Sequence, residues 1–90
     1  MNKQDLITAM SEQTMMTKAQ CEGALNALLD TVSNTLARGE SVSLIGFGRF
    51  DVRKREERSG RNPQTGKPLL LPAKNVPAFK PGSQLKAVVN

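Results

Sequence analysis

Residues 53–67 read RKREERSGRNPQTGK, and this stretch constrains the fold of everything around it. Six of these residues are Lys or Arg, and they alternate in such a way that an extended ribbon would be basic on both faces. The second half, from residue 59 onward, is dense in turn-forming residues and predicts the tip of a hairpin. Because a strand without a buried apolar face must leave the body of the protein, we expect a protruding basic β-arm.

The segments on either side of this arm carry the alternation of a half-buried sheet. Residues 42–44 and 50–52 alternate apolar with polar side chains, which predicts two short strands. Beyond the tip, residues 69–71 and 76–79 are apolar and should bring the chain back to the body. The prolines of this returning segment lack a backbone donor, so they argue against a central position in the sheet.

The first forty residues have helical periodicity instead. Asn2 predicts the N-cap of a first helix, which we expect to break at residues 11–16. Thr17 and Gln20 have the spacing of a capping box for a second helix with a broad apolar stripe, and Gly39 is placed to end it. We therefore expect an α+β fold: an N-terminal helical hairpin, a three-stranded antiparallel sheet with a protruding β-arm, and a short C-terminal helix.

Size and composition indicate that this fold does not close its core alone. The chain has 90 residues, of which 38% are hydrophobic, and its only aromatic residues are Phe47, Phe50 and Phe79. A chain of this length hides roughly 60% of its unfolded surface, so its own core is marginal. The stripe on the second helix is broader than one short partner helix can cover. We expect an intertwined dimer that shares its core.

The charge is unevenly distributed along the sequence. Residues 1–40 hold three basic and five acidic residues, whereas residues 41–90 hold ten basic and three acidic ones. Such asymmetry within a chain of net charge +5 predicts a polyanionic partner, and nucleic acid is the favoured one.

Composition excludes several other classes of protein. Without His, neither a Ser-His-Asp site nor a His-ligated zinc site can form, and we expect no enzyme, no metal and no cofactor. The single cysteine, Cys21, cannot form an internal disulfide and is expected in the core. We find no long apolar run, no signal-peptide pattern and no phosphate-binding P-loop, and therefore expect a soluble cytoplasmic protein without a membrane or small-molecule partner.

Pro63, at the predicted tip of the arm, has two interpretations. A proline in a turn usually only fixes φ. Flanked by cations on a protruding hairpin, it could instead act as an apolar wedge between base pairs.

The arm tip and its surroundings resemble those of a known family. Residues 60–67, GRNPQTGK, are similar to the arm signature of the bacterial HU proteins and integration host factor, and residues 46–50 and 76–80 also match that pattern. The resemblance covers essentially the whole chain and is closer to HU. It implies a dimer with a helical base, a sheet saddle and two arms that enter the minor groove of duplex DNA, each inserting Pro63; minor-groove kinking of this kind is a known property of the family.

The resemblance also implies a role for individual regions and residues. Residues 1–40 would form the dimerisation base, 41–52 and 74–81 the saddle, 53–73 the arm and 82–90 the final helix. The expected DNA contacts are Lys3, Lys18, Arg53, Lys54, Arg55, Arg58, Arg61, Asn62, Pro63, Gln64, Lys67, Lys74, Lys80 and Lys86. The expected dimer core comprises Leu25, Leu28, Leu29, Val32, Leu36, Leu44, Phe47, Phe50 and Phe79.

Two departures and two alternatives accompany this prediction. The returning limb reads LLLP at residues 69–72, where many relatives alternate basic with aliphatic residues, so its pairing in the arm is an open question. Ser83 stands where HU proteins often have lysine. We expect a nucleoid-associated protein that bends or compacts DNA with little sequence preference, as a homodimer or with a paralogue. The alternatives are a subunit like integration host factor that binds defined sites, and a basic protein with an acidic protein or an anionic lipid surface as partner.

Overall fold

Two compact units make up the chain in the computed structural model, which describes residues 1–61 and 64–90. The first unit is Met1–Asn34 and the second is Thr35–Asn90. Helix α2 passes from the first unit into the second. Each unit is described by itself below.

The first helix, α1 (Lys3–Thr14), begins with a complete capping box. The Asn2 side chain accepts a hydrogen bond from the Asp5 backbone N at 2.9 Å, and the Asp5 carboxylate accepts one from the Asn2 N at 3.1 Å. The helix ends at Met15, which has φ 63°. The predicted break at residues 11–16 therefore starts too early. Ser11 and Thr14 remain helical: the Thr14 hydroxyl donates to the Met10 carbonyl within the helix, and the Ser11 hydroxyl donates to the Met16 carbonyl just beyond the helix end.

The second helix, α2 (Lys18–Ala37), has the predicted signals at both ends. Thr17 N donates to Gln20 Oε1 at 3.0 Å, and Gln20 N donates to Thr17 Oγ1 at 3.1 Å. At the C-terminus Gly39, with φ 80°, donates to the Leu36 carbonyl, and Glu40 N donates to the Thr35 carbonyl. This pair of hydrogen bonds is a Schellman motif, which needs the left-handed backbone that glycine adopts without strain.

The core of the first unit is small. Ile7, Cys21 and Leu25 are its buried residues, and Met10 packs against them. Cys21 is thus a core residue, as predicted. Leu28 and Leu29, farther along the same helix, are about half exposed. The first unit therefore leaves much of the α2 stripe uncovered.

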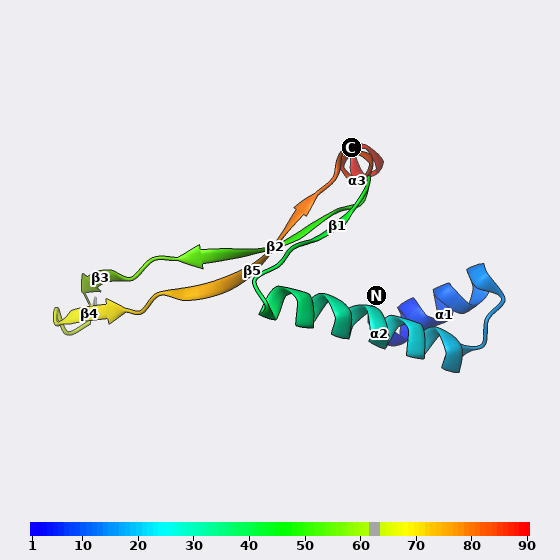
Figure 1. Cartoon of the computed structure of the whole chain (residues 1–90), viewed down its shortest axis with the longest axis horizontal. Helices are drawn as coiled ribbons and strands as arrows, with labels where there is room; N and C mark the ends of the chain where they lie inside the picture. The colour runs from blue at the N-terminus through cyan, green and yellow to red at the C-terminus, as the bar shows by residue number, and fades with distance from the viewer. Residues whose placement is uncertain (62–63) are drawn as a thin grey trace. The chain divides into compact units, whose positions relative to one another are not determined.

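The second unit is built on a three-stranded antiparallel sheet (Figure 1). Its strands are β1 (Val42–Leu44), β2 (Gly48–Arg55) and β5 (Lys74–Pro81), in the order β1-β2-β5. Strand β5 lies at the edge of the sheet, which explains how it accommodates Pro77 opposite Val52.

Strands β2 and β5 lead to a second hairpin, formed by β3 (Arg58–Arg61) and β4 (Pro68–Leu71) (Figure 1). The leucines of the returning limb pair completely with β3, from Arg58 opposite Leu71 to Arg61 opposite Pro68. The extended ribbon that we predicted from residue 53 to the arm tip is instead interrupted, because residues 56–57 and 72–73 lie outside the strands. Pro72 has no N–H to donate, which weakens pairing at this point.

The short helix α3 (Ser83–Val89) follows β5 and is held by backbone hydrogen bonds to the turn between β1 and β2. Gly82 N donates to the Phe47 carbonyl at 2.8 Å, and Leu85 N donates to the Gly46 carbonyl at 3.2 Å. A Cβ atom on Gly82 would lie 2.7 Å from the Gly46 carbonyl oxygen, so only glycine permits this close approach. With α3 in place, the predicted α+β fold class is confirmed.

Candidate nucleic-acid interface

The register of β2 and β5 gives this two-stranded ladder one strongly basic face. Side chains alternate between the faces of a strand, and directly opposed residues point to the same side. Arg49 is opposite Lys80, and Arg55 is opposite Lys74. The basic face therefore comprises Arg49, Arg53, Arg55, Lys74 and Lys80, with Asp51 as its one acidic residue on the described strands.

The opposite face of the same ladder is apolar from Gly48 to Val52, and toward the arm it carries Lys54 opposite Asn75. Phe50 lies opposite Phe79, and the centroids of their rings are 4.9 Å apart. Phe47 extends this cluster, with its ring centroid 5.7 Å from that of Phe79. Gly48 allows the rings to pack this way, since a Cβ there would lie 2.5 Å from the Phe79 ring. One sheet thus separates an aromatic surface from a cationic one.

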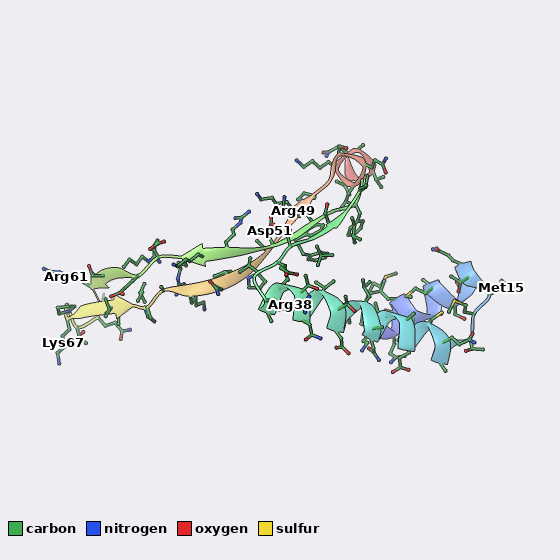
Figure 2. The ribbon with its side chains drawn as sticks, viewed as in Figure 1. Met15, Arg38, Arg49, Asp51, Arg61 and Lys67 are labelled. Atoms are coloured by element: carbon green, nitrogen blue, oxygen red, sulfur yellow. The ribbon has the colours of Figure 1, made fainter. Side chains whose placement is uncertain are left out.

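The arm continues the positive charge beyond the sheet. Arg58 and Arg61 are exposed on β3, and Lys67 is exposed beyond the turn (Figure 2). Gln64, in that turn, is engaged in an interaction of its own. The predicted contacts Asn62 and Pro63, and with them the predicted wedge, lie outside the described residues.

Most of the arm cations are not neutralised by acids. Among the described residues, none of Arg53, Lys54, Arg58, Arg61 and Lys67 forms an ion pair. Their charges are therefore available to an external anion.

The two glutamates of the arm lower its net charge without pairing. Glu56 and Glu57 form no ion pair within the described part of the chain.

Arg55 is half buried, and its Nε atom has no hydrogen-bond partner within the described part of the chain.

The predicted contacts on the helices are also at the surface. Lys3 is exposed and donates from Nζ to Asn26 Oδ1 at 2.6 Å. Lys18 is the exposed first residue of α2, and Lys86 is exposed in the last turn of α3. Lys3 and Lys18 belong to the first unit, whereas the arm and the sheet belong to the second.

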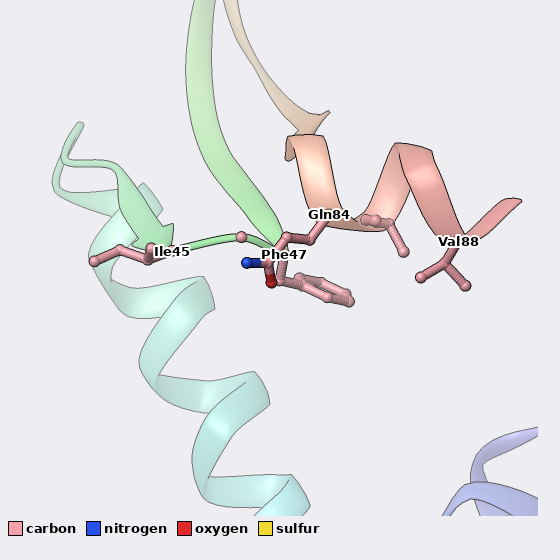
Figure 3. A pocket seen from close by; sticks show the side chains of 6 residues that line it. Ile45, Phe47, Gln84 and Val88 are labelled. Carbon is pink, nitrogen blue, oxygen red and sulfur yellow. The ribbon is translucent and has the colours of Figure 1, made fainter. Parts of the chain in front are cut away.

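The second unit also has a shallow hollow of about 260 Å³ between the β1–β2 turn and α3 (Figure 3). Apolar side chains of Ile45, Phe47, Leu85 and Val88 line most of it, together with Gln84. It contains no charged residue, so it does not extend the basic surface.

Sequence reasoning missed one residue of the basic face. Arg49 lies between Gly48 and Phe50 and is not among the DNA contacts predicted from the sequence. The signal was present, because Arg49, Arg53 and Arg55 occupy odd-numbered positions of one strand and must share a face.

These features together define a class. An extended ribbon with unpaired cations projects from a sheet with a cationic face, and this arrangement fits a polyanion that has a groove. Contacts between such cations and phosphates are the basis of nucleic-acid affinity. No helix in the described part of the chain is both long and apolar enough to cross a membrane. The fold and its surface are those of a β-arm nucleic-acid-binding protein.

Comparison with known proteins identifies the family. The family model described as "bacterial DNA-binding protein" matches residues 1–90. The chain is 54% identical over 89 residues to the DNA-binding protein HU of Staphylococcus aureus, covering 99% of both chains. It is 49% identical over 90 residues to DNA-binding protein HU-1 of Halalkalibacterium halodurans, covering all of both. The chain therefore belongs to the family of bacterial DNA-binding proteins, which confirms the resemblance found in its sequence.

Solved structures agree with this assignment. A structure described as an Anabaena HU–DNA cocrystal superposes with a TM-score of 0.91 at 40% identity, over 99% of this chain and 97% of the other. HU from Thermotoga maritima superposes with a TM-score of 0.73 at 31% identity, over the whole of both chains.

Proposed function

We propose that this chain is a histone-like architectural protein that binds duplex DNA through the minor groove with little sequence preference and bends, wraps or compacts it. The observation that carries this proposal is the continuity of charge from the basic face of β2–β5 onto β3, where the cations have no acidic partner within residues 1–61 and 64–90. Membership of the family and the likeness to an HU–DNA cocrystal structure support it.

The mechanism follows from the chemistry of these cations. Lys and Arg that meet phosphates release condensed counterions, which gives affinity without reading bases. The arm would follow the minor groove, and Pro63 at its tip would wedge into a base step and kink the duplex. DNA that is already nicked or flexible should then bind more tightly, because it costs less to deform.

We also propose that the working unit is a dimer, either of this chain or of this chain with a paralogue. Each unit leaves large apolar side chains at its surface: Leu28 and Leu29 in the first, and Phe47, Phe79 and Val88 in the second. Phe47 is 50% exposed, and a second copy that covered this large apolar side chain would stabilise the folded protein. In the resulting assembly residues 1–40 would form the dimer base, and the arms of residues 53–73 would extend to the DNA, at the nucleoid in the cytoplasm.

One experiment tests the proposed function directly. The protein, expressed alone, is titrated in a gel-shift assay against linear, nicked and four-way-junction DNA of matched length. We expect binding to all three, with the nicked and branched forms bound more tightly. A preference for one defined linear site far above random duplex would instead favour a subunit like integration host factor. Failure to bind any of them would contradict the proposal.

A further inference from the structure

The basic face contains a small, organised cluster around Asp51. Arg49 Nε lies 2.8 Å from Asp51 Oδ1, and Lys80 Nζ lies 3.9 Å from Asp51 Oδ2. Arg49 also donates from Nη2 to Ser41 Oγ at 3.2 Å. Figure 2 shows Arg49 and Asp51 close together on the strand. Two contacts hold the Arg49 guanidinium, one from Asp51 on β2 and one from Ser41 before β1, while Lys80 on β5 lies near the other oxygen of the same carboxylate.

The acidic side chain of this cluster is more deeply buried than its two cations. The Asp51 side chain is only 14% exposed, whereas the side chains of Arg49 and Lys80 are 56% and 62% exposed. The carboxylate is thus largely covered, with its two cations toward solvent. An anion that approaches from solvent meets the cations and not the carboxylate.

Arg49 retains most of its donors. A guanidinium carries five N–H groups, and the contacts to Asp51 and Ser41 use two of them. No third residue in the described part of the chain forms a hydrogen bond or an ion pair with this guanidinium. Since Nε and one Nη2 hydrogen are already engaged, the planar group is held in a fixed orientation, with its remaining donors available for a phosphate oxygen pair.

We propose that Arg49 is a further phosphate-contact residue, and that Asp51 and Ser41 are positioning residues that hold its guanidinium on the basic face. This inference rests on the proposed function, because it assumes that duplex DNA is the polyanion that meets this face. It adds a fixed contact on the sheet to the contacts expected from the arm. In this proposal Asp51 belongs to the binding site as the group that orients Arg49, and it is not merely a negative charge that weakens DNA binding.

Alanine substitution of Arg49 tests the contact. Binding of a fluorescently labelled duplex is measured by anisotropy between 50 and 200 mM salt. Removing one phosphate contact lowers the salt slope by about 0.9, so the affinity loss across this range should be about 3.5-fold smaller for Arg49→Ala than for the parent. An unchanged slope would overturn the proposal. If the alanine variant does not fold, Arg49→Gln removes the same charge and is judged by the same criterion.

Arg38 provides a matched control. It is an arginine in an ion pair with Glu40, with N and O 3.6 Å apart, and its side chain is 60% exposed. It is not on the β2–β5 ladder, so Arg38→Ala removes the same charge without removing the proposed contact. Its salt slope should equal that of the parent. A slope lowered as much as in Arg49→Ala would show that net charge alone explains the result and would overturn the proposal.

The role of Asp51 is decided by a double-mutant comparison. If Asp51 positions Arg49, the fold-loss caused by Arg49→Ala should be smaller in an Asp51→Asn background, because the arginine is no longer held. If Asp51 instead competes with DNA for Arg49, the fold-loss should be larger there, which would overturn the positioning role. A parent protein that binds no DNA would contradict the proposed function itself, which separates that failure from this one.

Discussion

Phe50 and Phe79 face each other across β2 and β5 with ring centroids 4.9 Å apart, while their sequence neighbours Arg49 and Lys80 face each other on the other side of the same strands. The Phe79 side chain remains 41% exposed in the single chain. A half-exposed aromatic cluster on the back of a cationic face indicates that something apolar covers it, and a second copy of the chain is the occupant we propose.

Phe79→Ala tests whether this cluster is shared between two chains. Truncating a fully buried Phe costs about 3–5 kcal/mol in free energy of unfolding, and a Phe that stays 41% exposed should cost far less. We expect a loss of at least about 3 kcal/mol in denaturant unfolding, because the partner completes its burial. The parent should sediment at about twice the 9.8 kDa chain mass, with an unfolding midpoint that rises with protein concentration.

Leu70→Ala serves as the control for this measurement. Leu70 lies on β4 of the arm and is 64% exposed, outside the proposed dimer core. The free energy of unfolding of the Leu70→Ala variant should stay within about 0.5 kcal/mol of that of the parent. A midpoint independent of protein concentration, together with a small effect of Phe79→Ala, would refute the dimer.

Gly82→Ala should destabilise the second unit by about 1–3 kcal/mol. The added Cβ would lie 2.7 Å from the Gly46 carbonyl oxygen and 2.9 Å from the Gly46 carbonyl carbon, and these are backbone atoms with little room to adjust. Thermal unfolding followed by circular dichroism measures the change. Gly23→Ala is the matched control, because nothing lies within 4 Å of its added Cβ in the single chain and alanine favours a helix by about 0.5–1 kcal/mol. A Gly82→Ala protein as stable as the parent would contradict the tight approach.

Arg58→Ala and Arg61→Ala should each weaken binding to all duplex sequences by similar factors. Both residues are exposed on β3 without an ion-pair partner among the described residues, so each can replace about one counterion. Anisotropy titrations over a series of salt concentrations should show the slope reduced by about one unit for each. A loss confined to one sequence, with an unchanged slope, would indicate base readout instead of an architectural mode.

The sequence predicted features that depend on neighbouring residues. The N-cap at Asn2, the capping box at Thr17 and the helix end at Gly39 involve residues a few positions apart, so their chemistry is readable from spacing alone. The edge position of β5 was indicated by its prolines for the same local reason.

Features that depend on strand register could not be predicted in this way. The cluster of Arg49, Asp51 and Lys80 joins two strands whose pairing is known only once the sheet is formed. The interruption at residues 56–57 also depends on the residues of the opposite strand. Pro72 comes to lie opposite this segment only when the hairpin has folded. The end of α1 was misplaced because Ser11 and Thr14 are helical, and the helix ends instead at Met15, whose backbone is left-handed.

Pro63→Ala distinguishes a wedge from a turn residue at the arm tip. Pro63 lies outside the described residues, so the prediction rests on its sequence setting, a proline between Arg61 and Lys67 on a cationic hairpin. The substitution leaves every cation in place, and the counterion contribution to affinity should therefore largely survive. Bending should fall, because unstacking a base step costs a few kcal/mol and needs an apolar group to fill the gap. Energy transfer between dyes at the two ends of a short duplex measures the bend at saturating protein. The preference for nicked over intact DNA should change as well, since a nick already relieves the stacking that the wedge must break. A variant that bends the duplex as strongly as the parent would show that Pro63 only fixes the turn.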